Sequence, residues 1–505
     1  MQGTTSKKQS RLQYKWIVAI VVIFGSFVSI LDQTVVNNAF PTLQRAFTTD
    51  LSHLQWVITA YTLTQGVVTP VTAFFANRLG TKRFYVLSLT LFTLGSTLCG
   101  LAWNLLTLIV FRIVQGIGGA TLFPLAITLL FSEFPVHQRG LASGLLSITA
   151  LLAQAVGPTL GGYIVTYASW RLIFSINVPV GVVGIILALW LLRPHPTEGR
   201  SHFDTPGFVL IAFGLAFVLY ALSHATVSGW GATSVLVTLA GGFCLLVVFV
   251  MVELLTAKRG GQPLVDLRLF ANGPFLFSNI ANAMVGLSFF GSLILSPIYM
   301  QDLRGLSAFQ SGLLTLPQAF AAALAAIGGG WIVDRFGVRI MLFPGLVLMG
   351  LSTWQLTGAT LTTPYPWLVM IYTLRGLGLG CLVQTLTVAS FSKVESSQYT
   401  QASSLSTVVR FVFTSLGIAM LATFVQSRAS THISSLLSQS RPRSHAALTL
   451  LSQQGLNLAV QDAFWFSLVG FLVAFVAVCF LRTRMPAARE KAEHREQTPG
   501  RMPVE

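Results

Sequence analysis

Runs of roughly 20 mostly apolar residues recur along almost the whole chain, and each is long enough to cross a hydrocarbon core of about 30 Å. In that solvent, only helices or a closed barrel satisfy every backbone polar group. The strands of a barrel would alternate apolar and polar residues, whereas these runs are apolar on all sides. Only 9% of the 505 residues are charged, against roughly 25% in soluble domains. The sequence therefore predicts an all-α, polytopic membrane protein.

Fourteen spans are predicted, and the basic residues orient them. With the N-terminus inside, 22 of the 31 Lys and Arg residues fall on the cytoplasmic side, 6 fall outside, and the remaining 3 lie within spans. An excess of Lys and Arg is typical of cytoplasmic loops, so both termini are predicted to be cytoplasmic. The predicted spans begin near residues 16, 54, 84, 104, 141, 172, 206, 233, 274, 309, 340, 366, 400 and 463.

The net charge of +16 would suggest a nucleic-acid partner in a soluble protein. Here the basic residues follow the predicted topology, so we expect contact with membrane lipids and no nucleic-acid binding. The four cysteines are scattered singly in apolar runs, which predicts neither a disulfide framework nor a metal site. The first apolar run is too long for a signal-peptide core and is predicted to remain as a span.

Two short motifs occur once in each half of the chain. Arg112, Gln115 and Gly116 belong to a motif whose counterpart begins at Arg375. The other motif is a cytoplasmic loop motif, with Asn77, Arg78, Gly80, Lys82 and Arg83 in the first copy and Asp334, Arg335, Gly337 and Arg339 in the second. Two halves around a site near the membrane midplane are the architecture of secondary transporters.

Further motifs follow in the order of one known family. They are the segment 31–41 in the first span, Gly157-Pro158-Thr159-Leu160-Gly161-Gly162 in the fifth, the segment 176–181, and the segment 263–267. From about residue 16 to 482, the chain resembles the fourteen-span drug:proton antiporter group of the major facilitator superfamily, the QacA/EmrB type. The resemblance implies a monomeric, non-enzymatic transporter of the plasma or inner membrane. It needs no cofactor, and its partners are a small-molecule substrate and protons.

The repeat and the resemblance together divide the chain. We expect two six-helix bundles of the major facilitator fold with two further transmembrane helices between them. The predicted parts are a cytoplasmic N-tail at 1–15, the first bundle at 16–195, the inserted helices at 196–256, the second bundle at 257–482 with an extracellular loop at 428–462, and a cytoplasmic C-tail at 483–505.

Asp32 is the one acidic residue placed well inside a predicted span. A carboxylate there costs several kcal/mol unless it is paired or faces water, and such residues usually serve function. A titrating carboxyl group could hold a proton in one state and act as counter-ion to a cationic substrate in another. The alternative is a salt bridge that only fixes helix packing.

Arg112 is the predicted partner of Asp32. Both residues are expected about 10 Å below the outer surface, at a rise of 1.5 Å per helical residue. The resemblance implies that their spans line a central cavity, where Gln33, Asn37, Gln115 and Gly116 would have cavity or conformational roles. Arg375 and Arg410 also lie within spans but have no obvious acidic partner, and for both a substrate contact and a structural role stay open.

The glycines of the fifth span are predicted to let a neighbouring helix pack closely against it. Gly157 and Gly161 lie four residues apart, so they share one helical face and permit close approach of a neighbouring helix. Pro158 removes a backbone hydrogen bond and kinks the span. Similarity to the antiporter motif favours a role for Gly157, Pro158, Gly161 and Gly162 in the exchange mechanism, and the alternative is ordinary small-residue packing.

Asn77 departs from the family pattern, which has an aspartate at this position. The resemblance implies that this aspartate favours the outward-open state through contacts between the two halves. An asparagine cannot carry that charge, whereas the second copy keeps Asp334.

The sequence favours a proton-coupled exporter of small lipophilic, cationic compounds. A dedicated exporter of one endogenous metabolite or lipid would use the same machinery and is not separable from it here. The repeat argues against a channel, receptor or membrane enzyme, and the chain has no phosphate-binding loop of an ATP-driven pump.

Overall fold

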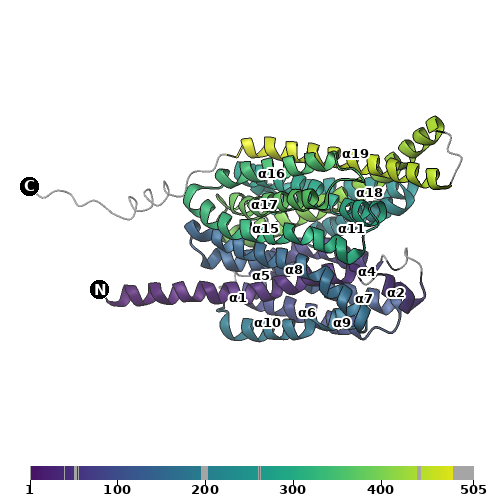
Figure 1. Cartoon of the computed structure of the whole chain (residues 1–505). Helices are drawn as coiled ribbons and strands as arrows, with labels where there is room; N and C mark the ends of the chain where they lie inside the picture. The colour runs from purple at the N-terminus through teal and green to yellow at the C-terminus, as the bar shows by residue number, and fades with distance from the viewer. Residues whose placement is uncertain are drawn as a thin grey trace, which may run out of the picture.

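The structure is a computed structural model that describes residues 2–38, 40–49, 54, 56–194, 203–259, 261, 263–440 and 445–481. All regular structure in these ranges is helical, which confirms the predicted all-α class. The long helices run side by side, and both chain ends lie at the same end of the bundle (Figure 1). We call the end where α1 begins and α19 finishes the tail end, and the opposite end the far end.

The first half of the chain supplies the helices that surround α1. Several predicted spans are interrupted rather than continuous, because short 3-10 or irregular turns separate their parts. The elements are α1 (Gln2–Asn38), α2 (Phe40–Phe47), α4 (Trp56–Val68), η1 (Thr69–Val71), α5 (Thr72–Leu79), α6 (Thr81–Gly100), α7 (Leu105–Glu133), η2 (Val136–Gln138), α8 (Arg139–Tyr167), α9 (Leu172–Ser175) and α10 (Asn177–Leu191).

The inserted pair and the second half follow. The first long segment of the second half contains two π-helical stretches, η4 and η5. The elements are α11 (Thr205–Ser228), α12 (Thr233–Lys258), η3 (Leu267–Ala271), α13 (Gly273–Val285), η4 (Gly286–Phe290), α14 (Leu295–Pro297), η5 (Ile298–Leu303), α15 (Ala308–Phe336), α16 (Arg339–Thr357), α17 (Tyr365–Ser390), η6 (Ser396–Gln398), α18 (Tyr399–Ser440) and α19 (His445–Cys479).

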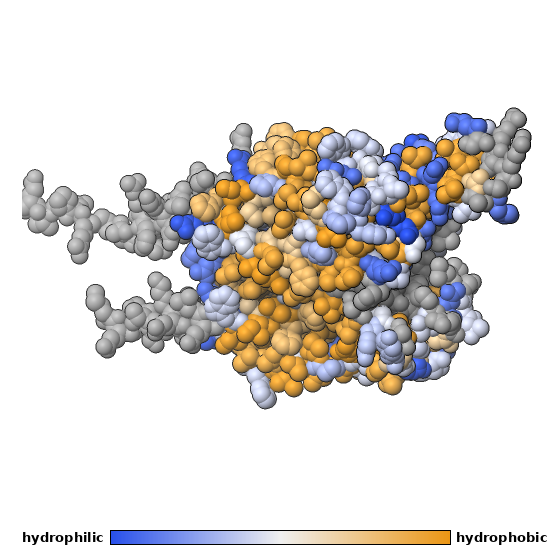
Figure 2. All heavy atoms as spheres, in the orientation of Figure 1, coloured by the Kyte–Doolittle hydropathy of each residue, from blue (hydrophilic) through white to orange (hydrophobic). Residues whose placement is uncertain are grey.

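Eleven helical segments of the described residues are long and apolar enough to cross a membrane. The other three predicted spans coincide with the broken pair α4 and α5, with α6, and with α8. The number fourteen therefore stays a prediction. Figure 2 shows apolar side chains over most of the middle of the visible face. Large exposed hydrophobic residues such as Trp190, Phe243 and Leu472 suit contact with lipid.

The two copies of the loop motif form equivalent turns. Gly80 ends α5 with a φ angle of 81°, and Gly337 ends α15 with a φ angle of 88°. These angles lie in the left-handed region, which glycine reaches without steric cost. The backbone conformation therefore explains the repeated glycine: the chain reverses at the tail end within one residue after α5 and within two residues after α15.

The segment 428–462, predicted as an extracellular loop, is helical for most of its length, and its extracellular location stays a prediction. Helix α18 continues to Ser440 and α19 begins at His445, so the two helices form a hairpin that projects from the far end (Figure 1). The 42 residues of α18 span about 63 Å, twice a hydrocarbon core. Serine hydroxyls of this segment donate to carbonyls of their own helix, as in Ser434 to Thr431 O at 2.9 Å.

An ion pair fastens the two arms of this hairpin. Arg428 Nε on α18 lies 2.7 Å from Asp462 Oδ2 on α19, and His432 Nε2 lies 2.9 Å from the same oxygen. These contacts join residues that the sequence placed at the two ends of a loop.

The topology can be tested with reporter fusions. A reporter after residue 200 and one at the C-terminus are expected to read as cytoplasmic, and one inserted near residue 440 as external. Activity of paired cytoplasmic and periplasmic reporters in the same strain is the measurement. A cytoplasmic reading near residue 440 would contradict the fourteen-span arrangement.

The two halves of the chain pack together most closely toward the tail end. Helix α8 runs along α15, and α7 contacts α18. Hydrogen bonds join the halves there: Ser143 donates to Gln384 O at 3.1 Å, and Ser403 donates to Pro124 O at 3.1 Å. The structure therefore represents a state in which the halves meet at the tail end.

Candidate functional site

Asp32 lies in α1 and is fully buried. Its Oδ2 forms an ion pair with Arg112 Nη1 at 2.6 Å. Its Oδ1 accepts hydrogen bonds from Gln115 Nε2 at 2.9 Å and from Asn177 Nδ2 at 2.8 Å. Both amides also donate to Ser96 Oγ, each at 3.1 Å. Four helices, α1, α6, α7 and α10, thus contribute to one buried polar cluster, which we call the Asp32 cluster.

Arg112 is held by more than the carboxylate. Its Nε donates to Val57 O at 3.2 Å, and Nη1 donates to Gln115 Oε1 at 2.8 Å. The guanidinium lies 4.1 Å from the ring centroid of Tyr61 and 5.7 Å from that of Phe174. Cations are attracted to aromatic faces at such distances. The arginine therefore keeps several partners if the carboxylate is neutralised.

The other residues predicted near Asp32 lie in the same region with different partners. Gln33 Nε2 donates to Gln65 Oε1 at 3.0 Å, so it bonds to α4 rather than to Asp32. Gly116 fits closely against α4, where an added Cβ would lie 3.1 Å from a backbone oxygen. Asn37 and Pro158 lie in α1 and α8, but their side chains are outside the described part.

Asn177 and Ser96 belong to the Asp32 cluster, although sequence reasoning did not single them out as site residues. Asn177 stands in a motif that carries the family resemblance, and that was the only available signal. Asn177 Oδ1 is buried and has no hydrogen-bond partner among the described residues. The cluster therefore contains one unused acceptor beside the carboxylate.

The glycines of α8 allow close contact with α1. An added Cβ at Gly157 would collide with Thr34, and one at Gly161 would lie 2.9 Å from Val35 O. Gly162 is different, because an added Cβ there would meet no other atom within 4 Å. Packing therefore accounts for Gly157 and Gly161, which hold α8 against the helix that carries Asp32, but not for Gly162.

Arg375 occupies the corresponding place in α17 and is also buried. Its Nη2 donates to Ser292 Oγ, and its guanidinium lies 5.1 Å from the ring of Phe289 and 5.9 Å from that of Phe464. No acidic residue among the described ones pairs with it. The second half thus has the arginine of the repeat without the acid.

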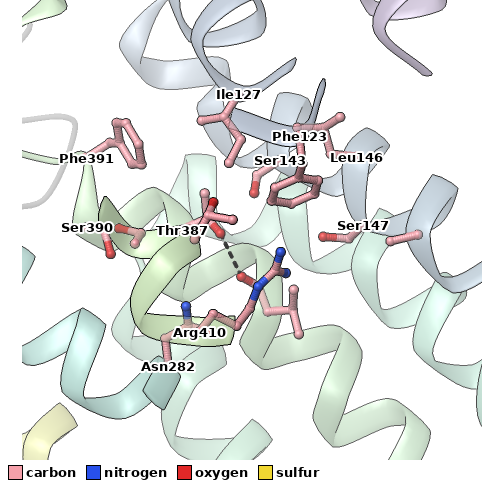
Figure 3. A pocket seen from close by; sticks show the side chains of 14 residues that line it. Phe123, Ile127, Ser143, Leu146, Ser147, Asn282, Thr387, Ser390, Phe391 and Arg410 are labelled. Atoms are coloured by element: carbon pink, nitrogen blue, oxygen red, sulfur yellow. Dashed lines mark hydrogen bonds between the residues drawn. The ribbon is translucent and has the colours of Figure 1, made fainter. Parts of the chain in front are cut away.

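Arg410 extends from α18 into a cavity between the two halves (Figure 3). Its guanidinium lies 4.6 Å from the ring centroid of Phe123 on α7. The cavity has a volume of about 640 Å³, counting space that is open to solvent. Arg410 and the Asp32 cluster therefore belong to separate places in the bundle.

Asp334 joins the two halves at the tail end. Its Oδ1 accepts from the backbone N–H of Gly140 at 2.7 Å, and its Oδ2 accepts from that of Leu141 at 3.0 Å. Both donors are in the first turn of α8, where the unpaired N–H groups and the helix dipole favour an anion. Asn77 lies in α5, which contacts α18, so the two copies of the motif contact opposite halves.

The basic residues of the loop motifs lie around these turns. Lys82 Nζ donates to Leu189 O at 2.7 Å, and Arg339 Nε donates to Leu481 O at 3.0 Å. Arg78 and Arg335 lie over aromatic rings, and Arg83 is exposed.

Asp334→Ala is expected to weaken the contact between the halves at the tail end. It removes two hydrogen bonds to a charged acceptor, each contributing about 1.5–3 kcal/mol. A cysteine introduced at Ser403, which is buried, should react faster with a water-soluble maleimide in this variant. Asp302→Ala, at an exposed acid of the far end, is the matched control. Equal labelling rates in all three backgrounds would contradict the prediction.

Glu253 is a second buried acid, which the sequence had placed at a span end. It lies in α12 and is 1% exposed. Its carboxyl and that of Asp204 face the same spot, since an added Cβ at Gly207 would lie 2.5 Å from Asp204 Oδ2 and 2.6 Å from Glu253 Oε1. Neither Glu253 oxygen has a hydrogen-bond partner among the described residues. Asp32 is therefore not the only acid that the bundle buries.

The described architecture matches known transport proteins. The family model described as Major Facilitator Superfamily matches residues 22–418. The chain is 33% identical to a protein named multidrug resistance protein B homolog from Mycobacterium tuberculosis, over 79% of this chain and 74% of that protein. It is 29% identical to the riboflavin transporter RibZ of Clostridioides difficile, over 82% and 89% of the two chains. Among solved structures, the human organic anion transporter MFSD10 matches with a TM-score of 0.58 and 13% identity, over 90% of this chain and 99% of that one.

Proposed function

Since this chain belongs to the major facilitator superfamily and is a multi-pass transporter of the multidrug-efflux type, we propose that it is a proton-coupled antiporter. It exports small lipophilic compounds across the cell membrane, with both termini in the cytoplasm. The proton gradient supplies the driving force without a cofactor, and the functional unit is a monomer.

The observation that carries this proposal is the Asp32 cluster. A fully buried carboxylate is paired with Arg112 at 2.6 Å, in a bundle that must pass protons through a low-dielectric interior. Protonation would cancel the ion pair, and Arg112 would keep its contacts with Val57 and Gln115. Ionisable residues at such depth usually serve proton or substrate pathways.

Asn177 supports the exchange of a proton at this place. A protonated carboxyl group needs an acceptor, and Asn177 Oδ1 is buried beside Asp32 without a partner among the described residues. Rotation of the Asn177 amide would turn this oxygen toward Asp32 in place of the Nδ2 that now donates at 2.8 Å. The cluster therefore has hydrogen bonds for both the charged and the neutral carboxyl group.

The contacts between the halves support alternating access. In the described state, the halves meet at the tail end through Asp334 and the first turn of α8. Export requires these contacts to break and re-form as the substrate site turns from one side to the other. The prediction of cationic substrates rests on Asp32 as counter-ion and requires its release from Arg112.

The test is transport by the purified protein in proteoliposomes. An imposed pH gradient is expected to drive uphill accumulation of a lipophilic fluorescent dye, and collapse of the gradient by a protonophore is expected to stop it. Empty liposomes are the control. Accumulation that ignores the pH gradient would rule out proton coupling.

A dedicated exporter of one metabolite is the second candidate. One of the relatives is named a riboflavin transporter, which supports a narrow substrate range as an alternative. Growth of a pump-deficient host on a panel of toxic compounds separates the two, since a multidrug exporter raises resistance to several unrelated compounds.

A further inference from the structure

The cavity that contains Arg410 is lined by both halves of the protein. Phe123 and Ile127 come from α7, Ser147 from α8, Asn282 from α13, and Arg410 from α18. Figure 3 shows Arg410 and Asn282 on one side and Phe123, Ser143 and Ser147 across from them. The space between these side chains is about 640 Å³ when the part open to solvent is counted.

The charge carried by the residues that line this cavity is positive only. Arg410 is the only charged residue among the 14 that line it, and none of them is Asp or Glu. Within the described residues, the Arg410 guanidinium makes no hydrogen bond and no ion pair; its contacts are with aromatic rings. A cation inside a membrane protein is costly unless water or a counter-charge satisfies it. This one faces a cavity, so its counter-charge can arrive with a ligand.

Two other polar groups of the lining, those of Ser406 and Asn282, also have no hydrogen-bond partner among the described residues. The Ser406 hydroxyl lines the cavity and is buried, and no group in the described part of the chain forms a hydrogen bond with it. The Asn282 amide makes no hydrogen bond with any described residue. Guanidinium, amide and hydroxyl groups all donate hydrogen bonds, and a carboxylate is an acceptor that can bind several donors at once. The rest of the lining is mixed: six residues are apolar, namely Phe123, Ile127, Leu146, Ala150, Val383 and Phe391, and five carry hydroxyl groups, namely Ser143, Ser147, Thr387, Ser390 and Thr407.

From these groups we infer that the cavity binds organic anions, with a carboxylate against Arg410 and Asn282 and a lipophilic body against the apolar lining. The inference rests on the proposed transport function and names a substrate class for it. Export of an anion is also favoured by an inside-negative potential, by about 2.3 kcal/mol per charge for each 100 mV. A contact with Phe123 that merely holds the halves together is the competing role for Arg410.

Binding of three matched probes to the purified full-length protein tests this inference. The probes are pyrenebutyrate, pyrenebutanol and a pyrenebutyl trimethylammonium salt, which share one aromatic body and differ in charge. Pyrene fluorescence reports each dissociation constant. The wild-type protein is expected to bind the anion more tightly than the alcohol and the cation.

Arg410→Gln is expected to weaken binding of pyrenebutyrate by about 10- to 100-fold, the range for a lost hydrogen bond to a charged group. Binding of pyrenebutanol should change less than about 2-fold, because the apolar lining is intact. Arg410→Lys should keep part of the preference for the anion, since it keeps the charge. Arg268→Gln, at an exposed arginine 62% accessible, is the matched control and should bind all three probes like the wild type.

Asn282→Ala provides a second test if Arg410→Gln fails to fold, as judged by size-exclusion chromatography. It should weaken pyrenebutyrate selectively by about 5-fold, as expected for one lost hydrogen bond. Equal weakening of all three probes by these variants would show a structural role and overturn the inference. So would tighter binding of the cation by the wild type, or no binding of pyrenebutyrate at millimolar concentration.

Failure of this inference is distinguishable from failure of the proposed function. Gradient-driven transport of the cationic or neutral probe, without a role for Arg410, would support proton-coupled export and contradict the anion site. Binding of pyrenebutyrate through Arg410, without any response of its transport to a pH gradient, would support the anion site and contradict proton-coupled antiport.

Discussion

Asp32→Asn is expected to abolish uphill efflux driven by a pH gradient. The variant removes the only acid of the Asp32 cluster, and an amide cannot bind and release a proton in the working pH range. Loss of active transport by at least about 100-fold is expected if this carboxyl group is the coupling site, because without it the gradient has no group to act on. Downhill equilibration of a substrate can survive.

The variant is expected to fold, because the cluster can rearrange its hydrogen bonds. The new amide oxygen can accept from Arg112. The new NH₂ group can donate to Asn177 Oδ1, which has no partner in the described part of the wild-type chain. Arg112 keeps Val57 O at 3.2 Å and Gln115 Oε1 at 2.8 Å. If the variant elutes like the wild type in size-exclusion chromatography but shows no uphill transport, the loss is therefore one of proton coupling and not of folding.

Proteoliposomes with an imposed pH gradient give the measurement, with Asp302→Asn as control. Asp302 is an exposed acid at the far end, so its neutralisation changes the same charge without touching the cluster. Full gradient-driven efflux by Asp32→Asn would eliminate Asp32 as the coupling site. Glu253, the other acid buried within a long helix, would then be the next group to neutralise.

The helical fold and part of the site could be predicted from the sequence, because both depend on local patterns. Apolar runs, basic loops and the two copies of the loop motif predicted the helical architecture. The depth of Asp32 and Arg112 in their spans predicted that the two would lie at the same level, since a helix rises 1.5 Å per residue. The structure brings them to 2.6 Å.

The remaining contacts depend on tertiary packing that no local pattern encodes. Ser96 reaches the cluster only because α6 packs against α7, and nothing around it in the sequence differs from an ordinary apolar span. The cavity at Arg410 requires three helices of the second half to meet two of the first. The helical hairpin of α18 and α19 was not predicted either, because the ion pair that joins its arms links Arg428 and Asp462, which lie 34 positions apart in the sequence.

Arg112→Ala is expected to destabilise the protein strongly. It leaves the carboxylate of Asp32, which is fully buried, with only the amides of Gln115 and Asn177. Removal of one partner from a buried ion pair typically costs about 3–5 kcal/mol, and here Val57 O also loses its donor. The yield of monodisperse protein and the midpoint of thermal unfolding in detergent are expected to fall well below those of the wild type. Arg268→Ala, at an exposed arginine paired with Asp266, should change them little.

The double variant Asp32→Asn with Arg112→Ala separates the cost of an unpaired charge from the cost of lost packing. If the unpaired carboxylate causes the damage, the second substitution removes it, and the double variant should unfold at a higher temperature than Arg112→Ala alone. The coupling of two residues in contact is expected to be about 0.5–3 kcal/mol. Additive effects would mean that the ion pair contributes no coupling energy, so that the damage in Arg112→Ala would come from its other lost contacts, such as the one with Val57 O.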